Sequence, residues 1–292
     1  MYQVLTRSRV GIYEKALPNN MDWEKKFITA KELGFDFFEI SIDESDERRS
    51  RLDWNDDTIY HIKRLSEQYQ LPLHSMCLSA HRKFPFGSAN AATREQAKIH
   101  MNKAITLAYK LGIRTIQLAG YDVYYEKANT DTHQRFIEGM QWAAKQAERA
   151  SVMLAVEIMD TQYLNSLSKF EILRREINSP YFCAYPDIGN ISGWNYDVCT
   201  ELILSSSHIT QIHLKDTYNV NGDYQGQFRD LVIGEGDVDF DLIFKTLKQI
   251  NCVVPLVIEM WAQDDNWRKN IIQAQQRINK ACFNAKMPLL FS

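Results

Sequence analysis

The sequence lacks several features that would assign it to other classes of protein. Its 292 residues include five cysteines, an odd number, and no two of them have CxxC spacing. Reduced thiols are therefore expected, rather than disulfides or zinc knuckles. Lysine and arginine (34) do not outnumber aspartate and glutamate (37), and the net charge of −3 argues against nucleic acid as a partner.

Long apolar segments are also absent. No run approaches the length needed to span a bilayer, so no membrane partner is expected. The N-terminal segment MYQVLTRSRVGIYEK has no long apolar core after its basic residues and is predicted not to be a signal peptide. Together with the reduced thiols, this predicts a cytoplasmic protein.

What the sequence does contain is a regular alternation of two kinds of segment. Short runs rich in β-branched and aromatic residues are apolar at nearly every position, which is typical of parallel strands buried on both faces. These runs lie at 10–13, 35–42, 71–79, 114–121, 152–159, 181–188, 209–215 and 254–261. Helical patterns separate them, and two of these patterns end at the helix-stopping residues Gly34 and Gly112.

Eight such strand–helix pairs predict an α/β fold of the (β/α)8 TIM-barrel type. There is no linker rich in Pro, Gly or Ser and no low-complexity tract, so residues 1–292 are expected to form a single domain. A doubly wound open sheet is the alternative, but no GxGxxG motif follows the first predicted strand.

Four polar residues lie near the ends of four successive apolar runs. They are Glu157 in VMLAVEIM, Asp187 in FCAYPDIGN, His213 in ITQIHLKD and Glu259 in VPLVIEMW. Each buried carboxylate needs a compensating partner, and the carboxyl ends of barrel strands meet at one face. The set predicts one divalent metal ion and suits Mn²⁺ or Zn²⁺ better than Ca²⁺. A network of ion pairs is the alternative, although Lys215 is the only basic residue inside these runs.

Glu157 and Glu259 can also transfer protons. A metal that chelates a ketone oxygen and its adjacent hydroxyl would stabilise the enediolate formed when the α-proton leaves. One glutamate would remove that proton and the other would return it on the opposite face, which inverts one stereocentre. If the proton returned to the neighbouring carbon, the same residues would make an aldose–ketose isomerase.

Other polar residues follow the remaining strands, where the functional loops of a barrel begin. His81 and Arg82 are predicted to hold a phosphate, with a solvated basic loop as the alternative. The long polar loop 217–233 carries Arg229 and is predicted to be a lid or binding segment. The residues expected to contact substrate on these grounds are Glu14, His81, Arg82, Gln117, Lys215 and Arg229.

Two further segments are open to two interpretations each. The GEG at 234–236 would offer backbone N–H groups to an anion, or form a simple turn before a helix. The charged run DESDERRSRLDW is interpreted as a solvated face rather than a binding site.

Nine segments between residues 11 and 261 carry a family resemblance: GIYEKALP, LGFDFFEISIDESDERRSRLDW, MCLSAHRKFPFGS, IRTIQLAGYDVYYEKAN, EIMD, YPDIGNISGW, HLKDT, GEGDVDF and IEMW. They resemble the L-xylulose-5-phosphate 3-epimerases of L-ascorbate catabolism, which are also catalogued as L-ribulose-5-phosphate 3-epimerases or hexulose-6-phosphate isomerases. These enzymes belong to the xylose-isomerase-like barrel superfamily.

The resemblance implies an isomerase that acts on a ketopentose phosphate, interconverting L-xylulose 5-phosphate and L-ribulose 5-phosphate. It implies that Glu157 and Glu259 are the acid/base pair and that both, with Asp187 and His213, bind the metal. It also implies that Asn190 faces the substrate. The segment YNVNGDYQGQFRD is a poor match, so the resemblance does not supply the phosphate donors. The oligomeric state is left open, with a homodimer as one form.

Three other functions are alternatives to the epimerase. A hexulose-6-phosphate isomerase would use the same metal site and differ only in where the second proton lands. A phosphodiesterase of the endonuclease-IV type would need more histidine ligands and a basic surface, and this chain has neither. A non-catalytic sugar-binding barrel gives no reason for two glutamates at the strand ends.

Overall fold

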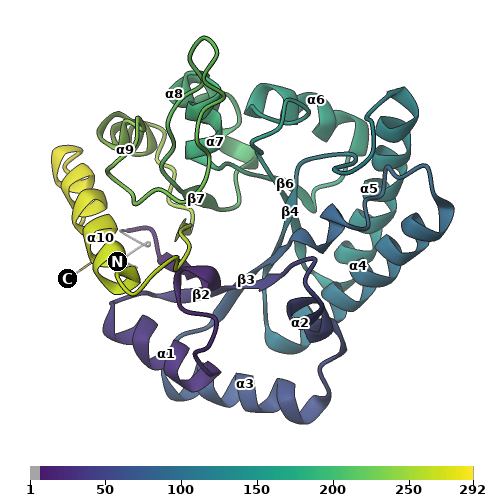
Figure 1. Cartoon of the computed structure of the whole chain (residues 1–292), viewed down its shortest axis with the longest axis horizontal. Coiled ribbons are helices and arrows are strands. Elements are labelled where there is room, and N and C mark those ends of the chain that lie inside the picture. The colour runs from purple at the N-terminus through teal and green to yellow at the C-terminus, as the bar shows by residue number, and fades with distance from the viewer. Residues whose placement is uncertain (1–6, 292) are drawn as a thin grey trace, which may run out of the picture.

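The computed structural model of this protein describes residues 7–291 (Figure 1). Residues 1–6, which belong to the segment predicted not to be a signal peptide, and residue 292 lie outside the described residues. Eight parallel strands form one sheet in the order β6-β5-β4-β3-β2-β1-β8-β7. They are β1 (Val10–Tyr13), β2 (Phe37–Ile42), β3 (Leu73–Leu78), β4 (Thr115–Ala119), β5 (Met153–Glu157), β6 (Phe182–Tyr185), β7 (Ile212–Leu214) and β8 (Leu256–Ile258).

The sheet closes into a barrel, so the open-sheet alternative is wrong. Strand β1 pairs with both β2 and β8, which makes the first and last strands neighbours. Two isolated bridges, Ala184–Ile209 and Asp187–His213, span the remaining gap between β6 and β7. The TIM barrel predicted from the alternation of segments is confirmed.

Helices surround the strands, as Figure 1 shows. The helices are α1 (Trp23–Glu32), α2 (Asp46–Arg49), α3 (Asp56–Gln68), α4 (Ala91–Leu111), α5 (Thr130–Ala150), α6 (Leu167–Ile177), α7 (Ile188–Gly193), α8 (Val198–Leu204), α9 (Phe240–Gln249) and α10 (Trp267–Asn284). Gly34 and Gly112 follow α1 and α4 with φ of 78° and 76°, a left-handed conformation that favours glycine. Across residues 7–291, no helix combines the length and the apolar character that a membrane crossing requires.

The two faces of each strand meet different surroundings, because successive side chains of a strand point to opposite sides. Phe38 and Ile40 of β2 belong to the large apolar core that the helices share. Phe37, between β1 and β3, belongs instead to a separate small cluster with Tyr13, Cys77 and Val257. The outward faces therefore hold the helices, and the inward faces are available for other side chains.

The charged run after β2 differs from its predicted solvated face. Arg48 and Arg51 are only 7% and 6% exposed. Arg51 extends from the 3₁₀ turn Ser50–Asp53 and binds the buried carboxylate of Glu14, at 2.5 and 2.8 Å. Arg48 lies 3.4 Å from a carboxylate oxygen of Asp43. The interpretation as a solvated face is wrong for these two arginines, because buried carboxylates require compensating charge.

The GEG segment forms a turn that binds a carboxylate of the chain itself. Asp216, which is buried, accepts hydrogen bonds from the backbone N–H groups of Gly234 (2.7 Å), Gly236 (3.0 Å) and Val238 (3.2 Å). These donors are therefore occupied, and they are not free for an external anion. The turn before helix α9 is the interpretation that agrees with the structure.

The close approach of β1 and β2 inside the barrel gives a testable prediction. A Cβ at Gly11 would lie 2.2 Å from Cε2 of Phe37. We expect Gly11→Ala to lower the free energy of unfolding by about 1–3 kcal/mol, because overpacking forces a buried ring from its position. Combining it with Phe37→Leu should recover part of that loss, giving a coupling of about 0.5–3 kcal/mol in urea unfolding.

Gly34→Ala is the matched control. Its added Cβ would meet nothing within 4 Å, so any cost comes from the left-handed φ alone. This variant should combine additively with Phe37→Leu. Additivity of the Gly11 and Phe37 changes would instead show that the two side chains do not compete for the same space.

Candidate active site

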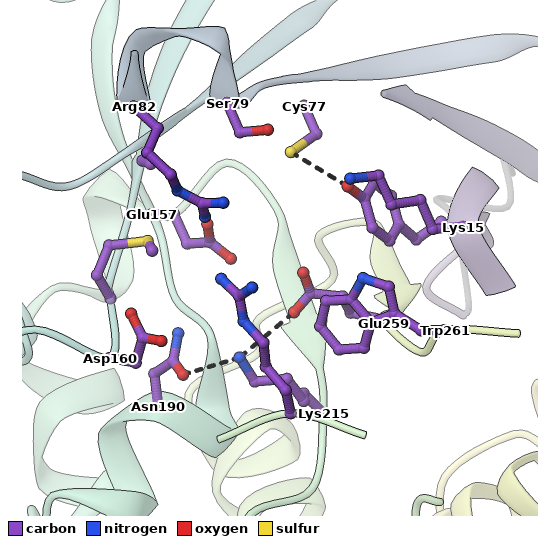
Figure 2. Close-up of a pocket in the computed structure, with 14 residues that line it drawn as sticks. Lys15, Cys77, Ser79, Arg82, Glu157, Asp160, Asn190, Lys215, Glu259 and Trp261 are labelled. Carbon is purple, nitrogen blue, oxygen red and sulfur yellow. Dashed lines mark hydrogen bonds and ion pairs between the residues drawn. The ribbon is translucent and has the colours of Figure 1, made fainter. Parts of the chain in front are cut away.

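A pocket opens at the carboxyl ends of the strands (Figure 2). Of the residues expected from the sequence to act in a site, six line it: Arg82, Glu157, Asn190, Lys215, Arg229 and Glu259. Figure 2 shows the carboxylates of Glu157 and Glu259 pointing into the same space, with Lys215 below them. The strand ends thus bring together residues that are more than 170 positions apart in the chain, such as Arg82 and Glu259.

Four side chains at this face form one cluster of potential metal ligands. Glu157, Asp187, His213 and Glu259 each offer one atom, and these atoms lie within 4.8 Å of one another. The four residues come from consecutive strands: Glu157 ends β5, His213 is the central residue of β7, and Asp187 and Glu259 follow β6 and β8. All four are buried. The ligand set predicted from the sequence is therefore brought together.

His213 lies between the two glutamates. Its Nδ1 is 2.8 Å from Oε1 of Glu157 and 3.5 Å from Oε2 of Glu259. Burial alone would lower the pKa of the imidazole, but the charges of Glu259 and Glu39 and the hydrogen bonds that the ring donates to carboxylates raise it well above its usual value. The carboxylates therefore favour positive charge at the position of this ring.

The carboxylate of Asp187 is divided between two tasks. Its Oδ1 caps helix α7 by accepting the backbone N–H of Asn190 at 2.9 Å. Its Oδ2 lies 2.7 Å from Nζ of Lys215, which is also 3.5 Å from Oε2 of Glu259. The helix cap fixes the side chain, so that its second oxygen faces the cluster.

The cluster has the properties of a cation site. Oε2 of Glu259 is buried without a hydrogen-bond partner among the described residues, and Oδ2 of Asp187 faces only the ammonium of Lys215. Burial, reinforced by the charge of Glu259, raises the pKa of Asp187 to about 6, although Lys215 and His213 oppose the rise. Because buried polar atoms are normally paired, these two oxygens fit a divalent cation held by carboxylates and one imidazole.

A second layer of polar residues lies directly beneath the cluster and was not identified from the sequence. Glu39 of β2 is fully buried, and its Oε1 lies 2.7 Å from Nε2 of His213. Burial would raise the pKa of Glu39, but the charge of His213 and several hydrogen bonds lower it. The available signal was the same as for Glu157, a glutamate inside an apolar run, but Glu39 lies in the middle of its run rather than near the end.

Gln117 and Asn190 support charged side chains of the site. Gln117 does not line the pocket; it is fully buried and its amide donates a hydrogen bond to Oε2 of Glu157. Asn190 lines the pocket, donates to the carbonyl of Ile158 at 2.9 Å and accepts from Lys215 at 2.8 Å. Both amides are therefore held by other protein groups.

Glu14 and His81, expected to contact substrate, are not among the residues that line the pocket. Glu14 is fully buried beneath the rim; burial would raise its pKa, but Arg51 and Lys26 lower it to about 2. His81 packs on Phe86, and burial lowers its pKa to about 4. Glu14 is thus occupied by two basic side chains, and the neutral imidazole of His81 supplies no charge to a phosphate.

Basic side chains stand at the mouth of the pocket. The guanidinium of Arg82 lies 4.8 Å from the ring centre of Tyr124 and 3.8 Å from a carboxylate oxygen of Glu44. The guanidinium of Arg229 lies 5.9 Å from the ring centre of Trp261. Aromatic faces hold arginine side chains without using their N–H donors, which stay available to an anion.

The loop that carries Arg229 has a defined structure. Tyr218 and Gln227 form an antiparallel bridge, as do Asn221 and Tyr224. Phe228 anchors the loop by packing on Trp194, with ring centres 5.7 Å apart. The predicted binding segment is thus tied to the end of α7, next to the residues of the cluster.

Sequence reasoning also missed several other residues that line the pocket. These are Tyr13, Lys15, Cys77, Ser79, Asp160 and Trp261 among others. Trp261 and Asp160 come two or three positions after Glu259 and Glu157, so proximity to the predicted ligands was the signal that could have identified them. Lys15 is held by Asp43 at 2.6 Å.

Comparison with known proteins agrees with this fold. The family model described as "Xylose isomerase-like TIM barrel" matches residues 27–281. Among solved structures, a D-allulose 3-epimerase from Methylomonas sp. superimposes with a TM-score of 0.76 at 18% identity, covering 94% of this chain and 98% of that one. An L-ribulose 3-epimerase gives a TM-score of 0.74 at 19% identity, covering 96% of each chain. At these identities, the solved structures establish the fold alone.

Closer relatives are found by sequence. A protein of Escherichia coli (strain K12), named provisionally as the L-ribulose-5-phosphate 3-epimerase SgbU, is 52% identical over 87% of this chain and 89% of its own length. The L-ribulose-5-phosphate 3-epimerase UlaE of Salmonella heidelberg (strain SL476) is 48% identical over 87% of each. The chain therefore belongs to the xylose isomerase-like TIM barrel family and, within it, to the L-ribulose-5-phosphate 3-epimerases, which are isomerase-class enzymes.

Proposed function

We propose that this protein is a metal-dependent 3-epimerase that interconverts L-xylulose 5-phosphate and L-ribulose 5-phosphate. The observation that carries the proposal is that Glu157 and Glu259 extend from different strands into one pocket, beside the same imidazole. Two proton-transferring groups around one carbon are what inversion of a stereocentre requires. The names of SgbU and UlaE support the phosphorylated pentulose as substrate.

The cation of this site would be held by Glu157, Asp187, His213 and Glu259, and Zn²⁺ or Mn²⁺ suits such a ligand set. When bound, a divalent cation would polarise the ketone of the substrate and stabilise the negative charge that develops when the neighbouring proton leaves. Lys215 supplies further positive charge at the same place, since its ammonium lies 2.7 Å from Asp187 and 3.5 Å from Glu259. Asn190 keeps this ammonium in position, because its Oδ1 accepts a hydrogen bond from Nζ at 2.8 Å.

Glu157 and Glu259 would exchange roles with the direction of the reaction. The ionised carboxylate on one side of the substrate removes the proton at C3, and the protonated carboxyl on the other side delivers one. Gln117 holds Glu157 for this step, because its amide binds the carboxylate oxygen Oε2. Delivery of the second proton to C2 rather than C3 would instead give an aldose–ketose isomerase.

Arg82 and Arg229 are our candidates for the phosphate donors. Both line the pocket that also holds Glu157 and Glu259, and each guanidinium lies against an aromatic ring, so either could bind the phosphate of a substrate whose ketone lies at the cluster. Lys215 and His81, which the sequence also suggested, are less suitable, since one is buried against carboxylates and the other is uncharged. A cytoplasmic role in L-ascorbate and pentose catabolism follows from the family resemblance.

The first prediction concerns the metal. Dialysis against a chelator should reduce epimerisation to background, and Zn²⁺ or Mn²⁺ should restore it, because the negative charge that develops on the substrate would otherwise lose its main stabilisation. Activity on L-xylulose 5-phosphate should be assayed beside elemental analysis of the same sample. Circular dichroism controls for unfolding. Full turnover by protein shown to be free of metal would refute the metal assignment.

The second prediction separates the two glutamates. Glu157→Gln and Glu259→Gln should each slow epimerisation by about 10²–10⁴-fold, because each loses one proton carrier. Each variant should still exchange the C3 proton of one epimer with D₂O through the remaining glutamate, and the two variants should act on opposite epimers. Deuterium at C3 and C2 is followed by NMR, starting from each epimer at matched metal occupancy.

Glu201→Gln is the matched control, since Glu201 is 8% exposed and binds Ser168 on the outer helices. It should epimerise at the unmodified rate. Exchange of the same epimer by both active-site variants would point to a single base, and deuterium at C2 would favour the aldose–ketose isomerase.

The third prediction concerns the phosphate. Arg82→Ala and Arg229→Ala should each lower kcat/KM for the phosphorylated ketose by roughly 10–150-fold, because a hydrogen bond to a charged group contributes about 1.5–3 kcal/mol. The same changes should leave kcat/KM for unphosphorylated L-ribulose nearly unaltered. Arg268→Ala, which removes a surface ion pair with Glu32, serves as the control. An equal loss of kcat/KM on both sugars would refute the assignment of these arginines to the phosphate.

A further inference from the structure

The polar layer beneath the ligand cluster is organised around one carboxylate. Glu39 lies between Phe38 and Ile40, which face the helices, so its own side chain points into the barrel. It reaches across the interior to the strands on the far side and is fully buried. A carboxylate in this position needs several partners to offset its loss of hydration.

The hydrogen bonds of this layer all point toward Glu39. The amide nitrogen of Gln211 donates to the hydroxyls of Ser75 and Tyr185, each at 2.8 Å. Those hydroxyls use their protons to donate to Oε2 of Glu39, at 2.6 and 2.7 Å. Glu39 is thus the acceptor at which both chains of donors end.

The remaining oxygen of Glu39 determines which ring nitrogen of His213 is protonated. Oε1 lies 2.7 Å from Nε2 of His213. Because an ionised carboxylate can only accept, Nε2 must hold a proton. The other ring nitrogen, Nδ1, lies 2.8 Å from Oε1 of Glu157, so it carries a proton as well. Nδ1 belongs to the ligand cluster, so a bound cation would take the place of that proton while Nε2 keeps its own.

We propose that Glu39 is a positioning residue for the metal site, which keeps the proton of the His213 ring on Nε2 and turns Nδ1 toward the cation. Hydrogen bonds from ligand imidazoles to carboxylates fix the tautomer and orientation of the ring and increase its basicity. Ser75, Tyr185 and Gln211 act through Glu39, because their hydrogen bonds hold its carboxylate in place. The inference rests on the metal site of the proposed function, but not on its substrate or its proton transfers.

The test is the affinity for metal of the purified protein with Glu39→Gln. We expect the dissociation constant for Zn²⁺ to rise by about 10–100-fold, measured by competition with a chromophoric chelator. An amide can rotate to donate to Nε2, so the ring would no longer be confined to the tautomer that leaves Nδ1 free. The absorption spectrum of the Co²⁺-loaded variant should also shift, since the ligand field of the imidazole changes.

Tyr185→Phe is the matched control. It removes one hydrogen bond to Glu39 but keeps the carboxylate and its contact with His213, so it should lower the thermal stability of the apoprotein and change metal affinity much less than Glu39→Gln does. A Glu39→Gln protein that loses stability but binds Zn²⁺ as tightly as the unmodified protein would overturn the proposal. Absence of metal binding by the unmodified protein would instead refute the metal site itself.

A measurement on the unmodified protein decides the matter if Glu39→Gln does not fold. In protein with ¹⁵N-labelled histidine and bound ¹¹³Cd²⁺, scalar coupling to cadmium is expected at Nδ1 of His213, with a proton on Nε2 of the same ring. Coupling at Nε2, or a proton on Nδ1, would overturn the role assigned to Glu39.

Discussion

The cost of burying carboxylates inside a barrel is the constraint on which the rest of this structure depends. Glu39, Glu157, Asp187 and Glu259 all lie in or just above the strand layer, and each is less than 9% exposed. Their basic partners at this level are His213 and Lys215. Four carboxylates against two basic groups leave an excess of negative charge, which suits the site to a divalent cation.

The alternation of side chains along each strand lets one short segment serve two purposes. In β8 and the residue after it, Leu256 and Ile258 belong to the apolar core shared with the helices, while Val257 and Glu259 face the interior. Packing against the helices fixes the height and direction of each strand, and this in turn fixes where the inward polar side chains meet. Stability and chemistry are thus carried by alternate residues of the same strands.

The sequence was sufficient to predict what depends on local pattern. All eight strands lie within the apolar runs that predicted them, and the four ligands were recognisable because they stand near the ends of such runs. Side-chain direction was not predictable in the same way. Glu14 follows β1 but turns inward to Arg51, a partner 37 residues away that local pattern does not reveal. Glu39 was missed because it lies in the middle of an apolar run, whereas the predicted ligands lie near the ends of theirs.

The loop 217–233 shows how recognition and chemistry are separated in this fold. Its contacts with the barrel are local: Phe228 packs on Trp194, and an added Cβ at Gly193 would lie 2.4 Å from the Phe228 ring. None of the four clustered ligands belongs to it. Evolution could therefore replace the hairpin, and with it Arg229, without rebuilding the catalytic centre. A barrel of this kind could therefore acquire a new substrate end group by exchanging one peripheral segment, while the strand ends that hold the ligands stay as they are.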